Sequence, residues 1–192
     1  MVPYTPKRFD VPEAQSVDPR RLGWPTDEEA DEESGLGCNR HYQDLRYVDW
    51  DEVAAMIKVE GALLARIEHS TDWEDEAANI DEELEEDLER EDFHPLWGLD
   101  LGVGSAVAAL SAFGCVPFTS CNGGAFGGEH LERYPLVAFY MRPTHLEGIA
   151  AAAAEVGAGL YEHGGSVQVF GETVHKLFDF ARRLHARAQH TT

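Results

Sequence analysis

Cysteine is scarce in this sequence, and its scarcity sets the first limits. Three cysteines occur among 192 residues, which is an odd number and too few for the disulfide framework of a small secreted domain. The N-terminal segment has no apolar run of the kind that a secretory signal needs, and no Asn-x-Ser/Thr motif occurs anywhere. We therefore expect a protein of a reducing compartment, with a cytoplasmic location.

Long apolar runs are lacking as well. The longest uncharged stretch covers residues 101–128, but glycine and proline interrupt it from Gly114 onward, so that only 101–113 has helical character. A membrane-spanning helix needs about 20 continuous apolar residues. The sequence therefore predicts no membrane association.

Basic residues are few and unevenly placed. The chain has 15 Lys and Arg against 36 Asp and Glu, giving a net charge of −21. Residues 1–100 hold 29 acidic against 9 basic residues, whereas residues 101–192 hold 7 against 6. A halophile surface would be acidic throughout, so the asymmetry indicates a neutral globular half with an acidic front half. Such a front disfavours direct nucleic-acid binding and attracts a basic protein partner.

Proline and charge divide the chain into three parts. Residues 1–37 contain five prolines and no apolar periodicity, which predicts a disordered acidic arm. Residues 38–94 have the pattern of an acidic helical hairpin, and residues 95–192 that of an α+β core. We expect 38–192 to fold as one unit, because this length can bury a proper core.

The expected hairpin consists of two amphipathic helices. The first covers 50–68, with Asp49 as N-cap and Glu52 completing a capping box. The second covers 72–91, and its narrow apolar stripe matches that of the first helix. The short connection between them favours an antiparallel arrangement.

Acidic side chains dominate the second of these helices. We expect the basic partner to bind to a run of carboxylates formed by Glu82, Glu83, Glu85, Glu86 and Asp87. The alternative is a solvated face that only supports solubility, which is the usual role of a charge run.

A small apolar helix is expected at 101–113, with Asp100 as N-cap and Gly114 at its end. It is apolar on all sides, which is typical of a buried helix. Gly102-x-Gly104 at its start resembles half of a phosphate-binding turn. No clear strand precedes it and the third glycine is missing, so nucleotide binding is not favoured.

The remaining pattern predicts two β-β-α units. Strands are expected at 115–121, 136–141, 160–163 and 166–170, with helices at 145–156 and 174–188. Gly164-Gly165 has the form of a two-residue hairpin turn. We therefore expect an α+β fold with a mostly antiparallel four-stranded sheet, helices on at least one face, and the acidic hairpin packed outside.

One candidate catalytic site lies where the first strand ends. The loop 122–134 is longer than a hairpin needs, and such loops are often functional. Cys121 at the end of the strand could be a nucleophile, with His130 as the base that lowers its pKa and accepts its proton. Glu129 or Asn122 could orient the imidazole.

Four glycines of the same loop add a second element. The main-chain N–H groups of Gly123 and Gly124, with Gly127 and Gly128 further along, could form an oxyanion hole or anion nest. The alternative is structural: cysteine is a common small buried residue, and Asn-Gly is a turn signal.

A metal site is the third possibility for this region. Cys115, Cys121 and His130 are zinc-type ligands, but a strand of six residues spans about 20 Å, whereas the ligands of one zinc ion lie within about 4 Å of each other. No Cys-x-x-Cys pair occurs either. The sequence therefore predicts no metal site and no other cofactor.

Two functions follow from these observations. The first is a cytosolic interaction or regulatory protein, of the immunity or inhibitor type, that binds a basic partner through its acidic front half. The alternative is a small cysteine-dependent hydrolase or transferase with Cys121 as nucleophile and His130 as base.

Overall fold

The computed structural model describes residues 4–31, 36, 42–89, 96–128 and 130–190, with the side chains of 86–89 left aside. The chain contains a four-stranded sheet in the order β1-β2-β4-β3. Its strands are β1 (Val116–Cys121), β2 (Leu136–Tyr140), β3 (Gly159–His163) and β4 (Ser166–Phe170). All three pairings are antiparallel, which confirms the predicted α+β fold.

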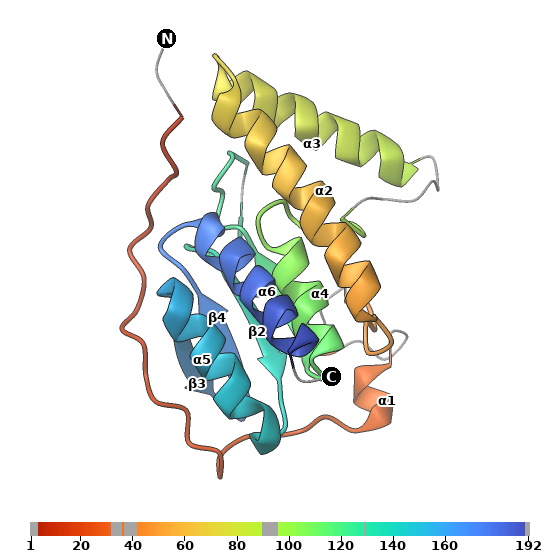
Figure 1. Cartoon of the computed structure of the whole chain (residues 1–192), viewed down its shortest axis with the longest axis vertical. Helices are drawn as coiled ribbons and strands as arrows, with labels where there is room; N and C mark the ends of the chain where they lie inside the picture. Colours follow the sequence, from red (N-terminus) through yellow and green to blue (C-terminus); the bar gives the residue numbers. More distant parts are fainter. Residues whose placement is uncertain (1–3, 32–35, 37–41, 90–95, 129, 191–192) are drawn as a thin grey trace.

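Six α-helices accompany the sheet among the described residues. They are α1 (Asp27–Ala30), α2 (Trp50–His69), α3 (Trp73–Glu89), α4 (Gly104–Ala112), α5 (Leu146–Val156) and α6 (Val174–Gln189), with a short 3-10 turn η2 (Pro143–His145) before α5. Helices α4, α5 and α6 lie over one face of the sheet, and α2 with α3 forms a hairpin beyond them (Figure 1). No helix among the described residues is both long and apolar enough to cross a membrane.

Local signals explain several of these boundaries. The Asp49 carboxylate accepts hydrogen bonds from the N–H groups of Asp51 and Glu52, and the Glu52 carboxylate accepts one from the Asp49 N–H. This is the predicted capping box. Gly164 and Gly165 both have positive φ, at 58° and 91°, as a tight turn between two antiparallel strands requires.

Helix α4 lies at the centre of the core. Its residues Gly104–Ser111 are all buried, because small side chains on every side let it pack closely between α2 and α6. The central strand β2 is buried on both faces: Val137 and Phe139 belong to the main core under the helices, while Leu136 and Ala138 pack with Phe170 on the opposite face.

The described part of the N-terminal arm, which we expected to be disordered, lies against the folded core. Residues 4–25 run as an extended chain along the side of the molecule where β3 and α5 lie (Figure 1). The N–H groups of Phe9, Gln15 and Gly23 donate to carbonyls of residues 172, 160 and 165 at 2.8–2.9 Å. Main-chain bonds of this kind leave no trace in composition, which is why composition suggested a disordered segment.

The start of α4 also differs from expectation. The helix begins at Gly104, and Asp100 is not its N-cap. Instead the buried carboxylate of Glu60 on α2 accepts the N–H groups of Gly102, Gly104 and Ser105 at 2.8, 3.1 and 3.0 Å. A carboxylate from a different helix thus fulfils the capping role. Asp100 is left free to make other contacts.

Candidate functional site

Cys121 occupies the last position of β1, where it pairs with Leu136 of β2. Cys121 is 7% exposed. The glycine-rich loop that follows turns back, so that the imidazole of His130 lies against the thiol, with 3.4 Å between Sγ and Nδ1. The predicted nucleophile and base are therefore neighbours in space.

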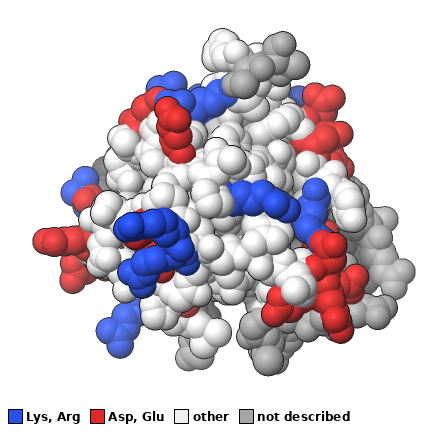
Figure 2. All heavy atoms as spheres, turned by 90° about the horizontal axis from the view of Figure 1, so that it is seen from below, with Lys and Arg blue, Asp and Glu red and all other residues white. Residues whose placement is uncertain are grey.

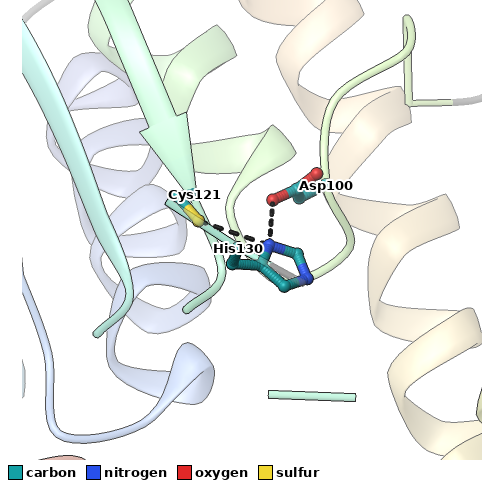
Figure 3. A group of neighbouring side chains, drawn as sticks. All are labelled: Asp100, Cys121 and His130. Carbon is teal, nitrogen blue, oxygen red and sulfur yellow. Dashed lines mark hydrogen bonds and ion pairs between the residues drawn. The ribbon is translucent and has the colours of Figure 1, made fainter. Parts of the chain in front are cut away.

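Asp100 is the third member of this group. Its Oδ2 lies 3.6 Å from Nδ1 of His130, and Figure 3 shows the carboxylate and the thiol on the same edge of the imidazole ring. The three side chains come from three separate segments: the turn before α4, the end of β1, and the loop after it. Nδ1 is the only ring atom involved in both of these contacts.

The other ring nitrogen of His130 fixes the tautomer. Nε2 lies 3.1 Å from the main-chain carbonyl oxygen of Gly127. A carbonyl only accepts hydrogen bonds, so Nε2 carries the proton, and Nδ1 of the neutral ring presents a lone pair. In a nucleophile–base–acid triad one ring nitrogen faces the nucleophile and the other faces the acid. In this site Nδ1 faces both the thiol and the carboxylate.

The electrostatic surroundings keep the thiol protonated. Burial raises the pKa of Cys121, and the negative charges of Asp100 and Glu132 raise it further, while the N–H groups of Gly123 and Glu132 act in the opposite direction. A raised pKa means that less thiolate is present than in a free cysteine at neutral pH. The resting site is therefore not that of an activated thiolate.

Asn122 connects the end of β1 to the turn that carries Asp100. Its N–H donates to Asp100 Oδ2 at 3.1 Å, and its side-chain amide donates to the carbonyl of Leu101 at 3.3 Å. These bonds place the Asp100 carboxylate rather than the imidazole. Glu129, the other expected orienting residue, lies outside the described residues.

The two inner glycines of the loop have their N–H groups already engaged. Gly123 N–H donates to Cys121 Sγ at 3.3 Å, and Gly124 N–H donates to Asn122 Oδ1 at 2.9 Å. An oxyanion hole needs donors that are free to turn to a substrate, whereas these two hold the site together. Gly127 and Gly128 are exposed and line the cavity described next.

A cavity of about 460 Å³ opens beside the site. One wall is the inner side of α3, and the other consists of the turn 98–101 and the glycine-rich loop, including Asp100 and His130. The acids Asp81 and Glu85 of α3 line it as well, and none of the described residues that line it is Lys or Arg. The potential inside is therefore negative and favours a cation or a positively charged group.

The carboxylates expected to bind a basic partner have different surroundings. Glu83 is paired with Arg66 of α2 at 2.8 Å, and Glu85 lines the cavity. Glu82 is exposed to solvent. The side chains of Glu86 and Asp87 lie outside the described part of the chain.

Cys115, the other cysteine considered as a zinc ligand, is buried. It is 1% exposed and packs in the main core, and burial raises its pKa well above the ordinary value. Asp100 is the member of the site that sequence reasoning missed. The only available signal was Glu60, a charged residue within the apolar stripe of α2; the structure shows that it caps α4, so that Asp100 is not needed in that role.

No family model, no curated protein sequence and no solved structure matches this chain.

Proposed function

We propose that this protein is a small hydrolase or transferase whose reaction takes place in the cavity between α3 and the glycine-rich loop. The observation that carries the proposal is the convergence of Asp100, Cys121 and His130, whose ligand or reactive atoms lie within 4.8 Å of one another. Titratable side chains that converge beside a cavity are typical of catalytic sites.

The polar surroundings of Cys121 support a chemical role. A structural cysteine needs only apolar neighbours, yet Cys121 contacts an imidazole that also lies against a carboxylate, and this carboxylate contributes to the raised pKa of Cys121. Main-chain donors from Asn122 and Gly123 hold the oxygen and the sulfur in place. Such positioning matters when the groups must react with a substrate or bind an ion.

The three side chains allow two routes to bond cleavage. In one, the thiol proton passes to Nδ1 of His130 as Sγ attacks the carbonyl carbon or phosphorus of the substrate, and Asp100 stabilises the imidazolium that forms. The bond to the departing group then breaks, and the imidazolium gives that group its proton. In the other, the three groups hold a cation that activates a water molecule. Both routes use the same atoms and the same cavity, so both belong to one proposed active site.

The test is hydrolysis of a panel of p-nitrophenyl carboxylic esters, phosphate monoesters, phosphate diesters and aminoacyl anilides, with and without added Zn²⁺. We expect Asp100→Asn, Cys121→Ala and His130→Gln each to reduce the rate at least about 100-fold. Asp75→Asn and His69→Gln change the same residue types at exposed positions and should leave it unchanged. Absence of turnover throughout the panel, or equal loss in the control variants, would contradict the proposal.

A second candidate function rests on the outer side of α3. This helix packs mainly along α2, and its side chains at Glu74, Asp75 and Glu82 are exposed. The face of the molecule seen in Figure 2 instead carries basic and acidic side chains intermixed. An acidic helix at the edge of the fold suits the docking of a basic protein partner.

Charge reversal tests this second candidate. The variant Asp75→Lys/Glu82→Lys should lose any basic protein that the wild type captures at low salt, whereas Asp100→Asn should retain it. Equal capture by the wild type and the reversed variant would rule out α3 as the docking surface.

A further inference from the structure

Three lone-pair atoms face one another beside the cavity. They are Oδ2 of Asp100, Sγ of Cys121 and Nδ1 of His130, all within 4.8 Å. The proton of the neutral imidazole is on Nε2, where the Gly127 carbonyl accepts it at 3.1 Å. With the neutral ring in this tautomer, Nδ1 presents its lone pair toward Sγ and Oδ2.

Each of the three groups is also held by the main chain. The N–H of Asn122 donates to Asp100 Oδ2 at 3.1 Å, and the N–H of Gly123 donates to Cys121 Sγ at 3.3 Å. Metal-binding histidines typically donate their second ring N–H to a carbonyl or carboxylate, which fixes the ring and the tautomer. His130 makes this contact with Gly127. The outer hydrogen bonds thus resemble those that support metal ligands.

Two of the three separations within the group match the spacing of zinc ligands, and the third, between Sγ and Oδ2, is within 4.8 Å. Nδ1 lies 3.4 Å from Sγ and 3.6 Å from Oδ2. Tetrahedral zinc, with bonds of about 2.3 Å to sulfur and about 2.0–2.2 Å to nitrogen and oxygen, places neighbouring ligand atoms roughly 3.4–3.6 Å apart. These two distances need almost no adjustment for binding.

We infer that Asp100, Cys121 and His130 bind a single divalent transition-metal ion, with Zn²⁺ as the preferred ion. A thiolate, an imidazole and a carboxylate form a set that suits zinc, whereas Mg²⁺ and Ca²⁺ prefer oxygen ligands alone. The carboxylate and the thiolate together balance the two positive charges. This inference rests on the proposed function for its site, and it names the cofactor of that site.

The position of the site beside the cavity indicates the role that a bound metal would have. Three protein ligands leave the fourth tetrahedral position for water or substrate, as in catalytic zinc sites. Asp100 and His130 line the cavity, so a fourth ligand can approach from there. Cys121 is then a ligand and not the nucleophile, which agrees with its burial. The acids Asp81 and Glu85 on the opposite wall favour the entry of a cation.

Direct metal titration tests the inference without any substrate. The full chain with Cys38→Ser, which removes a competing thiol, is stripped with a chelator and titrated with Co²⁺, then with Zn²⁺. We expect one equivalent to bind, with the sulfur-to-cobalt charge-transfer absorption and the strong visible bands of tetrahedral cobalt. Zn²⁺ should displace Co²⁺, as the relative affinities of the two ions predict.

Variants identify the ligands. Cys121→Ser should remove the charge-transfer band. Asp100→Asn and His130→Gln should weaken Zn²⁺ binding by more than the roughly 10–100-fold that loss of an outer partner costs. Asp81→Asn, an acid on the cavity wall outside the group, is the matched control and should have a small effect. Circular dichroism confirms that each variant is folded before titration.

Several outcomes would overturn the inference. Binding of less than one equivalent, an unchanged spectrum in Cys121→Ser, or equal weakening by Asp81→Asn and Asp100→Asn would each exclude a ligand set made of these three residues. Metal binding without turnover of any substrate would instead refute the proposed enzyme and keep the metal site. Turnover that survives removal of metal but not Cys121→Ala would refute the metal site and keep the enzyme.

Discussion

The buried carboxylate of Glu60 gives the sharpest test of how this fold is held together. Glu60 is fully buried on α2, and it accepts three main-chain N–H groups at the start of α4. Replacing it by alanine removes the only side chain that the described residues place at these three donors. We predict that Glu60→Ala is among the most damaging substitutions on α2.

The size of the effect follows from two opposing contributions. Each buried N–H left without an acceptor costs about 1–3 kcal/mol, which for three donors gives roughly 3–9 kcal/mol. Removal of the buried carboxylate also relieves its own desolvation penalty of several kcal/mol, so we expect the net loss to lie in the lower half of that range, at about 3–5 kcal/mol. Since whole domains are stable by about 5–15 kcal/mol, the variant would be marginally folded.

Two further variants make the prediction specific. Glu60→Gln keeps one oxygen acceptor but turns an amide N–H₂ toward the remaining donors, so we expect it to cost about 1–3 kcal/mol. Glu68→Ala removes a glutamate of the same helix that is 41% exposed and paired with His175, and should cost less than about 1 kcal/mol. Urea unfolding followed by circular dichroism gives all three values. A Glu60→Ala variant within about 1 kcal/mol of wild type would refute the capping role.

The same residue gives a pH dependence with a defined sign. Burial raises the pKa of Glu60 above its ordinary value of 4.5, although the N–H groups of Gly102, Gly104 and Ser105 oppose the shift. Between 4.5 and the raised pKa the native state binds more protons than the unfolded state, so stability falls as pH rises through this window. The difference in unfolding free energy between wild type and Glu60→Gln should fall in the same way. A rise would mean that the three N–H groups outweigh burial.

Three smaller predictions concern the loop, the hairpin and the arm. Gly123→Ala should cost at least about 1–2 kcal/mol in urea unfolding and disturb the Cys121 contact, because φ is +67° and a Cβ would lie 2.7 Å from the carbonyl carbon of Tyr134; an unchanged stability would be inconsistent with this backbone. Arg66→Ala should cost less than about 1 kcal/mol in the same assay, because its ion pairs to α3 are largely exposed; a larger loss would mean that they organise the hairpin. Lys7→Ala should leave global stability nearly unchanged but speed hydrogen exchange in the glycine-rich loop, because Lys7 Nζ donates to the Gly124 carbonyl at 2.9 Å; identical exchange would show that the arm does not restrain the loop.

Much of the fold could be predicted because its signals are local. The apolar period of α2 and α6, the capping box at Asp49 and the Gly164-Gly165 turn each depend on residues a few positions apart. The two β-β-α units follow from these elements in chain order. The sheet order β1-β2-β4-β3 adds the pairing between β2 and β4, which no local pattern encodes.

The site could be predicted only in part, since its members come from distant positions. Cys121 and His130 are separated by one loop, so their meeting was foreseeable from strand ends and loop length. Asp100 precedes Cys121 by 21 positions and His130 by 30, and hydrogen bonds from Asn122 to Asp100 and Leu101 hold it beside them. The main-chain carbonyl of Gly127, which sets the tautomer of His130, has no signature in the sequence at all.

One overlooked signal was present in α2. Glu60 lies on the same stripe as Val53, Met56, Leu64 and Ile67, all of which are buried. A charged residue in the middle of an apolar stripe needs a partner when the helix packs, and the small-residue segment at 102–105 supplies three N–H donors. The position of Glu60 could thus have indicated a buried carboxylate, though not which donors it would meet.

Glu60 and Asp100 together connect the stability of the fold to the chemistry of the site. Both acids lie near the start of α4, where N–H groups without a partner inside the helix attract a carboxylate. Because Glu60 satisfies the donors at 102, 104 and 105, Asp100 need not cap the helix and its Oδ2 accepts the Asn122 N–H beside His130 instead. A carboxylate with no capping duty is available to bind a cation or to stabilise an imidazolium. The buried glutamate therefore determines where the functional aspartate can be, and the core of this protein and its candidate site depend on the same short segment of chain.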